Sequence, residues 1–291
     1  MKSHENKETF DICNLQSFFD KNGYFVIENA FSQREVEDMQ EESNNILEFL
    51  INSSILNNRL SERLDLRRRS SGQQVIRKVQ PINDISSVFS KMASDERLVN
   101  TLRMLMNDEP ELMEEKLSYK QHLTNWVPGL RANDADDRFL IHNDWTYYQE
   151  NGYQPSIITA AICIDDCPPE SGPLHIWPGT HLTPLKHDTV QIVRNSYQIP
   201  TGLLNDSDST DLTLQSGALI FFHSLLAHKS EPNLTDTPRR IIFFSYVPKT
   251  QSIGLDVRNG PLRKKEAPYE ARFLSARKSG LCVDRYKLKP L

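Results

Sequence analysis

Six short β-rich runs follow one another after residue 117, and no helical pattern separates them. They read "SYKQHLTNW", "FLIHNDWTYY", "SIITAAICID", "GPLHIWP", "GALIFFHS" and "RRIIFFSYVP". β-Branched and aromatic residues favour strands, and the Pro, Gly and Asp clusters between the runs are typical of turns. Strands without intervening helices indicate a sandwich or jelly roll rather than a parallel, doubly wound sheet.

The part of the chain before these runs has a mostly helical pattern. The segment "LQSFFDKNGYFVIENAF" predicts a helix that closes at Gly23, followed by a short strand over Tyr24–Ile27. Ser32 is followed three residues later by Glu35, the spacing of a capping box at the start of the next helix. We therefore expect an α+β fold with a mainly β core, in which N-terminal helices pack on one sheet of a double-stranded β-helix (a cupin-like jelly roll).

The same pattern predicts how the chain is divided. We expect one domain over residues 1–291, which is a common size for a single large domain. Within it, residues 1–116 would be mostly helical support, with a helical region near 84–107. Residues 117–250 would form the jelly-roll core, and residues 251–291 a loop with a short helix.

Charge and cysteine content limit the possible partners. A formal net charge of −5 and a pI near 5.9 give no electrostatic case for nucleic acid or an anionic membrane. Four scattered cysteines suggest neither a zinc site nor a disulfide framework, so a reduced compartment fits best. Because the sequence contains neither a signal-peptide pattern nor an apolar run of 18 residues, we expect a soluble, cytoplasmic protein.

The run "IHNDWTYY" contains a histidine and an aspartate two residues apart. Its aromatic residues favour a strand, which would place His142 and Asp144 on one face. Such a pair is commonly only a surface contact, but it also matches two ligands of a metal if a third ligand exists. His223 and His228 are the candidates, because both lie near the end of the β region. Two histidines and a carboxylate form the facial triad of non-haem Fe(II) oxygenases.

Arg239 follows His228 by eleven residues and begins the apolar run "RRIIFFSY". A buried arginine is costly without an anionic partner. Its planar fork suits a carboxylate, and 2-oxoglutarate would provide one.

Four segments match a known family in the same order along the chain. They are "DKNGYFVIENAFSQREVEDM", "HNDW", "ESGPLHIWPGTH" and "HSLLAHKSEPNLTDTPRR". With them the chain resembles the phytanoyl-CoA dioxygenase-like family of Fe(II)/2-oxoglutarate-dependent oxygenases, over roughly residues 15–248. The resemblance implies Fe(II), 2-oxoglutarate and O₂ as cofactor and co-substrates, with ascorbate supporting activity.

The resemblance also implies roles for individual residues. His142, Asp144 and His228 would be the catalytic iron ligands, and Arg239 would bind the distal carboxylate of 2-oxoglutarate. His223 lies five residues from His228, and an odd spacing on a regular strand places it on the opposite face. Asp144 stands where halogenating members of the family have a small residue, so a halogenase is not expected.

The segment "QHLTNWVPG" has the Q-x-x-x-N spacing of the related ectoine hydroxylases. It implies that Gln121 and Asn125 help to hold 2-oxoglutarate, although ordinary hydrogen bonding between strands is an alternative. For the substrate pocket we consider Trp145, Tyr147, Trp177 and His175; core or turn positions are their alternatives. The cluster Arg67–Arg69 reads as a solvated face, with contact to an anionic substrate as the second interpretation.

The expected function is hydroxylation of an unactivated C–H bond of a small-molecule metabolite, in a specialised biosynthetic pathway. The acidic net charge and the lack of a dense basic patch near the β core argue against a CoA thioester. The alternatives are an acyl-CoA or amino-acid hydroxylase of the same family, an oxygenase acting on a protein side chain, and a non-catalytic jelly-roll binding protein. The sequence does not determine the oligomeric state.

Overall fold

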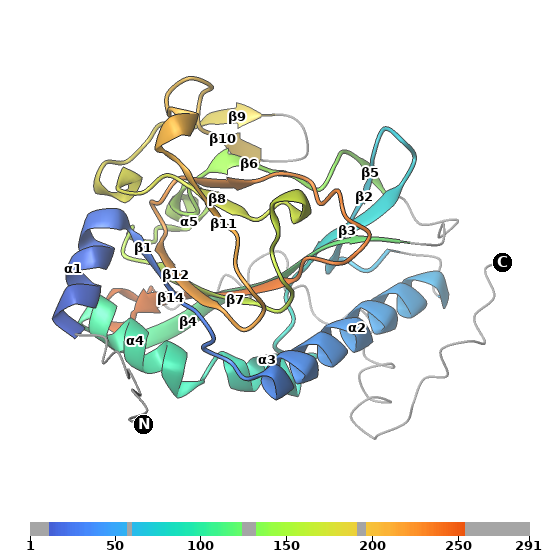
Figure 1. Cartoon of the computed structure of the whole chain (residues 1–291), viewed down its shortest axis with the longest axis horizontal. Coiled ribbons are helices and arrows are strands. Elements are labelled where there is room, and N and C mark those ends of the chain that lie inside the picture. Colours follow the sequence, from blue (N-terminus) through green and yellow to red (C-terminus); the bar gives the residue numbers. More distant parts are fainter. Residues whose placement is uncertain (1–11, 57–59, 124–131, 191–195, 254–291) are drawn as a thin grey trace, which may run out of the picture.

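The computed structural model describes residues 12–56, 60–123, 132–190 and 196–253, and its β-strands form two main sheets (Figure 1). In spatial order the larger sheet contains β1 (Tyr24–Ile27), β12 (Leu219–His223), β7 (Ile158–Cys163), β14 (Ile241–Pro248), β4 (Pro110–His122), β3 (Gln74–Val79), β2 (Leu64–Arg68) and β5 (Asn133–Asp134). The smaller sheet contains β11 (Thr210–Leu212), β8 (Leu174–Ile176), β13 (His228–Ser230) and β6 (Phe139–His142). Strands β9 (Asp188–Val190) and β10 (Ser196–Gln198) form a separate pair.

The helices lie mainly on the outer face of the larger sheet. They are α1 (Ile12–Asn22), α2 (Gln33–Leu56), α3 (Ser87–Met92), α4 (Glu96–Met106) and α5 (Trp145–Tyr148). Short 3₁₀ turns occur at Gln149–Asn151, Pro169–Ser171, Thr180–Leu182, Asp206–Asp208 and Lys249–Gln251. Figure 1 shows α2, α3 and α4 below the larger sheet and the smaller sheet above it. The predicted jelly roll with N-terminal helices on one sheet is therefore confirmed.

Strands β12 and β14 show why their sequences are continuously apolar. Phe221 and Phe244 point to the core between the larger sheet and the helices. Phe222 and Phe243, one residue away on each strand, point to the core between the two sheets. Successive side chains of a strand face opposite sides, so a strand covered on both faces needs apolar residues at every position.

The predicted helix boundaries near the N-terminus are confirmed. Gly23 ends α1 with φ of 78°, a backbone conformation that favours glycine, and β1 follows directly. At the start of α2 the backbone N–H of Ser32 donates to Glu35 Oε2 over 2.8 Å, and the backbone N–H of Glu35 donates to Ser32 Oγ over 3.4 Å. This reciprocal pair is the predicted capping box.

The prediction that residues 1–116 are mostly helical is wrong in its middle part. Strands β2 and β3 occupy residues 64–79, and β4 begins at Pro110. On β2, Leu66 is buried in the helix-facing core, while Asp65 and Arg67 face the opposite side. That side borders a polar cavity, so these strands lack the apolar texture by which the other strands were recognised.

The prediction of a strand through residues 141–148 is also wrong beyond His142. Strand β6 ends there, Asp144 has helical backbone angles (φ −68°, ψ −31°), and α5 follows. Asn143 Oδ1 accepts hydrogen bonds from the backbone N–H and the hydroxyl of Thr146, over 3.1 and 2.9 Å. The amide side chain thus stabilises a turn, which overrides the strand preference of the aromatic residues.

Two further expectations concern the ends of the chain and its relation to membranes. The predicted C-terminal loop and short helix lie mostly outside the described residues, which stop at 253. Within the described ranges, none of the helices combines the length and apolar character needed to cross a membrane.

We predict that Phe221→Ala lowers the free energy of unfolding by about 3–5 kcal/mol, because it opens a cavity in a closely packed core. The Phe221 ring is fully buried and stacks on Phe25 with ring centroids 4.9 Å apart. Urea denaturation followed by circular dichroism measures the change. Leu182→Ala is the control, since this side chain is 67% exposed and its loss should change stability by less than about 0.5 kcal/mol. Equal effects of the two substitutions would contradict the assigned core.

Candidate active site

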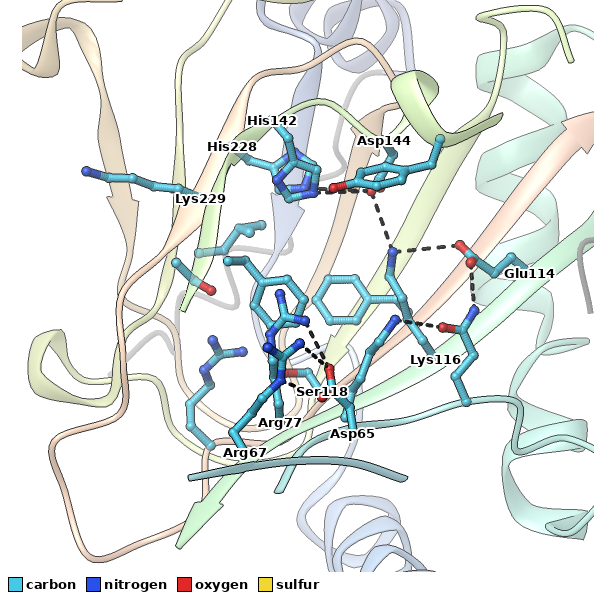
Figure 2. Close-up of a pocket in the computed structure, with 18 of the residues that line it drawn as sticks. Asp65, Arg67, Arg77, Glu114, Lys116, Ser118, His142, Asp144, His228 and Lys229 are labelled. Carbon is cyan, nitrogen blue, oxygen red and sulfur yellow. Dashed lines mark hydrogen bonds and ion pairs between the residues drawn. The ribbon is translucent and has the colours of Figure 1, made fainter. Parts of the chain in front are cut away.

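His142, Asp144 and His228 converge at one point between the two sheets (Figure 2). Asp144 Oδ1 lies 3.7 Å from His142 Nε2 and 3.9 Å from His228 Nε2. One potential ligand atom from each residue lies within 4.8 Å of the other two, and all three side chains are buried. Two imidazoles and one carboxylate in this arrangement form a metal-binding triad of the facial type.

The smaller sheet fixes the two histidines relative to each other. His142 is the last residue of β6 and His228 the first residue of β13, and the two are paired directly across these antiparallel strands. His142 Nδ1 lies 2.5 Å from the carbonyl of Leu140, and His228 Nδ1 lies 2.9 Å from the carbonyl of Leu226. An Nδ1–H that donates to a carbonyl leaves Nε2 with a free lone pair, which here points to the triad centre.

Lys116 on β4 is the closest cation to the triad carboxylate. Its ammonium lies 3.5 Å from Asp144 Oδ1 and 3.7 Å from Glu114 Oε2. Burial raises the pKa of Asp144, but Lys116 and the two histidines lower it further, and the pKa ends well below its usual range. Burial in turn lowers the pKa of Lys116, and the two carboxylates raise it above its ordinary value. Asp144 is therefore ionised and ready to bind a cation.

Burial and the neighbouring His142 lower the pKa of His228 to about 4. At neutral pH this imidazole is uncharged, which is the form that ligates a metal. The predicted choice of His228 rather than His223 agrees with this geometry. The His223 side chain lies on the face of β12 that points away from the triad. There its ring approaches those of Phe19 and His181, with centroid distances of 6.5 and 5.4 Å.

The triad opens into a cavity of about 550 Å³ between the sheets. Aromatic rings form part of its wall: Phe139, Tyr147, Tyr148, Phe222 and Phe243. Charged side chains from β2, β3 and β4 form another part. A cavity of this volume is typical of a site for a small molecule.

Arg239 lines the same cavity and is 2% exposed. Its Nη2 donates to the carbonyl of Gly172 over 2.7 Å, while its buried Nε has no hydrogen-bond partner among the described residues. Arg240 points to the opposite face, as strand parity predicts, and forms a two-pronged ion pair with Asp165 over 2.7 Å at each contact. Arg239 is thus the member of the pair with unused donor capacity beside the triad.

The four aromatic residues expected near the substrate are placed differently by the structure. Tyr147 lines the cavity, and its ring meets His142 edge-on at 5.6 Å. Trp145, Trp177 and His175 are not part of the cavity wall. Trp145 Nε1 donates to the carbonyl of Tyr153 over 3.1 Å.

The positions of His175 and Trp177 relative to β8 explain why neither lines the cavity. Leu174 lines it and Ile176 packs between the sheets, so His175, which has the opposite parity, points away and contacts Asp211. Trp177 lies beyond the strand and donates from Nε1 to the carbonyl of Asn205 over 3.0 Å. Neither residue lines the cavity beside the triad, and their contact with a substrate stays a prediction.

The Gln121 side chain lies on β4 opposite Ile76, outside the cavity wall. Its Oε1 is buried and has no hydrogen-bond partner among the described residues. Asn125 lies outside the described residues. The role of this pair in binding 2-oxoglutarate stays a prediction.

The interpretation of Arg67–Arg69 as a solvated face is wrong for its first member. Arg67 is 6% exposed and lines the cavity. Arg68 does lie at the surface, with Asp134 2.6 Å away, and Arg69 pairs with Asp137 over 2.5 Å. Arg67 and Arg68 separate because successive residues of β2 face opposite sides of the sheet, and Arg69 lies beyond the end of the strand.

Sequence reasoning missed the polar and charged residues of β4 that line the cavity. Glu114, Lys116 and Ser118 alternate with residues that face the helices, such as Leu117. This polar series with a period of two is the signal that could have identified them. The corresponding positions of β2 and β3 lie in a segment not recognised as strands.

His223 makes the stability of the protein depend on pH. Burial and the nearby His181 lower its pKa to about 4, while an unfolded histidine titrates near 6.5. Below pH 6.5 the unfolded chain therefore binds a proton that the folded chain does not, so stability falls as the pH drops from about 6.5 to about 4. We predict that His223→Asn removes roughly 1–3 kcal/mol of this loss.

Urea unfolding of both proteins at pH 7, 5.5 and 4.5 measures this effect. Asn is chosen because it can still accept the hydrogen bond that Leu225 donates to His223 Nδ1 over 3.1 Å. The variant should become more stable relative to wild type as the pH falls. A constant difference across the three pH values would show that His223 does not titrate as described.

Comparison with known proteins agrees with the geometry of the site. The model of the phytanoyl-CoA dioxygenase family matches residues 19–241. The ectoine dioxygenase of Sphingopyxis alaskensis is 27% identical over 243 residues, which cover 78% of this chain and 73% of the relative.

Two solved structures have a similar fold. EctD from S. alaskensis with 2-oxoglutarate and 5-hydroxyectoine matches with a TM-score of 0.61 and 23% identity, covering 82% of this chain and 76% of that one. The epimerase SnoN in complex with Fe³⁺, alpha ketoglutarate and nogalamycin RO matches with a TM-score of 0.63 and 19% identity, covering 88% and 92%. The family match and the His142, Asp144 and His228 triad lead to one conclusion: the chain belongs to the phytanoyl-CoA dioxygenase family and is an Fe(II)- and 2-oxoglutarate-dependent dioxygenase.

Proposed function

We propose that this protein hydroxylates an unactivated C–H bond of a small-molecule metabolite in a specialised biosynthetic pathway. The observation that carries this proposal is the opening of the triad into a cavity of about 550 Å³ that is also lined by Arg239. Cavities of this size accommodate metabolites rather than macromolecules. The substrate would lie between the aromatic wall and the charged strands, with its target C–H bond next to the triad.

The donor set fits Fe(II), which His142, Asp144 and His228 would hold through two imidazole nitrogens and one carboxylate oxygen. With 2-oxoglutarate and O₂ the bound iron supplies the oxidising power for the reaction, while the protein supplies binding and orientation. Lys116 keeps Asp144 ionised and holds its Oδ1 by a contact of 3.5 Å. The aromatic side chains exclude water from the space beside the triad.

Arg239 fits the distal carboxylate of 2-oxoglutarate. A buried guanidinium with an unused Nε–H leaves a donor unsatisfied, which is destabilising by about 1–3 kcal/mol. A carboxylate in the cavity would satisfy this donor and offset the buried charge at once. The predicted contribution of Gln121 and Asn125 to the same co-substrate is part of this proposal.

The alternative functions that the sequence left open would each require different features of the site. A non-catalytic jelly-roll module would need neither an intact triad nor a buried arginine beside it, and both are present. An oxygenase of protein side chains would need an open groove, whereas the cavity lies between the sheets and has side chains of both sheets in its wall. An acyl-CoA or amino-acid hydroxylase stays compatible with the site. The cytoplasmic location stays a prediction.

Anaerobic titration of the purified protein with Fe(II) and 2-oxoglutarate tests the proposal. We expect the weak visible charge-transfer band of a chelated keto acid. Succinate release, screened over a panel of metabolites that starts with ectoine, would then identify the substrate class. Folded protein that gives no such band would support the binding-module alternative.

His228→Ala should abolish the charge-transfer band, because it removes one of three ligands. His223→Ala is the matched control, since this histidine lies on the other side of β12 and should retain the band while losing some stability. Circular dichroism shows whether both variants are folded. If the band survives in the His228 variant and disappears in the His223 variant, the triad is assigned incorrectly.

Arg239→Lys should weaken 2-oxoglutarate binding about tenfold or more while iron binding persists. Lysine keeps the charge but loses the two-pronged geometry, and a charge-assisted hydrogen bond contributes roughly 1.5–3 kcal/mol. Arg240→Lys is the control, because its side chain pairs with Asp165 on the opposite face. Anaerobic titration of 2-oxoglutarate at saturating Fe(II) measures both. A larger loss in the Arg240 variant would move the assignment by one residue.

A further inference from the structure

One wall of the cavity is basic, and the proposed reaction with iron and 2-oxoglutarate does not use it. Asp65, Arg67, Arg77 and Lys78 from β2 and β3 form this wall, which we name the β2–β3 cluster. Figure 2 shows Asp65, Arg67 and Arg77 across the cavity from the two triad histidines. Three cations with one carboxylate leave the wall positively charged.

The two arginines share a single carboxylate. Arg67 Nε and Nη2 donate to the two oxygens of Asp65 over 2.5 and 3.0 Å. Arg77 Nη1 donates to Asp65 Oδ2 over 3.0 Å. Asp65 therefore neutralises only one of the two guanidinium groups. The buried Nε of Arg77 has no hydrogen-bond partner within the described part of the chain. The Arg77 guanidinium stacks on the Phe139 ring, with Cζ 3.6 Å from the ring centroid.

A β-bulge brings Arg77 and Lys78 to the same wall. In the pairing with β2, Asp65 is opposite Lys78 and Leu66 is opposite Ile76, so Arg77 is skipped. In the pairing with β4, Ile76 is opposite Gln121 and Lys78 is opposite Ser118, so Arg77 lies against two β4 residues, Tyr119 and Lys120. On a regular strand two successive side chains would face opposite sides, but the extra residue of a bulge redirects its side chain. Both cations consequently line the cavity.

Lys78 has no carboxylate of its own at this wall. Its ammonium donates to Gln80 Oε1 over 2.9 Å. Gln80 in turn donates to Glu114 over 2.7 Å, so that carboxylate is reached only through an amide. Burial and the nearby Lys116 lower the pKa of Lys78 to about 8.

The other charges of the cavity do not cancel this excess. Arg63 and Lys229 also line it, but each is paired with a carboxylate of its own, Asp84 and Glu231. Glu62 lines the cavity too, and the wall still has three cations against two carboxylates. Fe(II) and doubly ionised 2-oxoglutarate would add equal and opposite charges. The expectation of no dense basic patch near the β core is thus wrong.

We infer that the β2–β3 cluster binds an anionic group of the substrate, either a carboxylate or a phosphoryl group, with Arg77 as its main donor. The inference rests on the proposed function, because it assumes that the substrate occupies the cavity beside the triad. An anion at this wall would satisfy Arg77 Nε and neutralise the excess charge. It would also orient the substrate, since its anionic end would lie at β2–β3 and its opposite part next to the triad.

Isothermal titration calorimetry with three probes tests the inference. Inorganic phosphate and acetate represent the two kinds of anion, and tetramethylammonium is the cationic control. The protein is saturated with Fe(II) and 2-oxoglutarate under anaerobic conditions, and the titration is repeated without iron. At least one anion should bind with a Kd in the millimolar range, and comparison of the two shows which chemistry is preferred. Tetramethylammonium should not bind.

Three variants locate the anion. Arg77→Gln should weaken anion binding about tenfold or more, and Arg77→Lys should give an intermediate loss because it keeps the charge without the fork. Arg68→Gln removes the same charge from the exposed face of β2 and should bind the anions as wild type does. The 2-oxoglutarate affinity of all three variants should stay within about twofold of wild type. Thermal melting shows that each variant is folded.

Three outcomes would overturn the inference: no anion binds wild type, Arg77→Gln binds anions unchanged, or its 2-oxoglutarate affinity falls in parallel. The last would assign the cluster to the co-substrate. A missing charge-transfer band in wild type would instead count against the proposed function, while the titration without iron would still decide whether this wall binds anions.

Discussion

The direct pairing of β6 with β13 is the constraint on which the active site depends. It places His142 opposite His228, and the carbonyls of Leu140 and Leu226 orient both rings. The smaller sheet packs on the larger one through the core layer that contains Phe222. The metal site is therefore a product of the sheet arrangement, and a shift of one residue in either strand would turn one imidazole away from the other.

Charges buried beside the triad are stabilised mainly by one another. Lys116 lies between Asp144 and Glu114, and the Tyr148 hydroxyl donates to Glu114. Removing one partner of such a network leaves an uncompensated buried charge, which is destabilising by several kcal/mol. By contrast the Nε–H groups of Arg239 and Arg77 have no hydrogen-bond partner among the residues that the structure describes. Two such donors next to a cavity, beside buried charges that are otherwise paired, suit the binding of anions there.

The sequence was sufficient for the parts of the fold that have a strong periodic or compositional signal. Strands such as β7, β12 and β14 are apolar at nearly every position, because both faces of the larger sheet are covered. The triad was also predictable, since ligand chemistry demands particular residue types. The reason given for the closeness of His142 and Asp144 was nevertheless wrong. A turn held by Asn143 brings them together, and its amide contacts override the strand preference of the neighbouring aromatic residues.

The charged wall could not be predicted because its strands carry polar residues on the cavity face. On β2 only Leu64 and Leu66 mark the core side, and two apolar positions are too few to reveal a period. The bulge at Arg77 is a property of the pairing of β3 with β2, and the register of β3 with β4 shifts at the same residue, so the bulge has no signature in one strand alone. Substrate recognition thus depends on local departures from regular strand geometry, whereas metal binding depends on residue types. That difference explains why the iron site could be predicted from the sequence, whereas the substrate-binding wall could not.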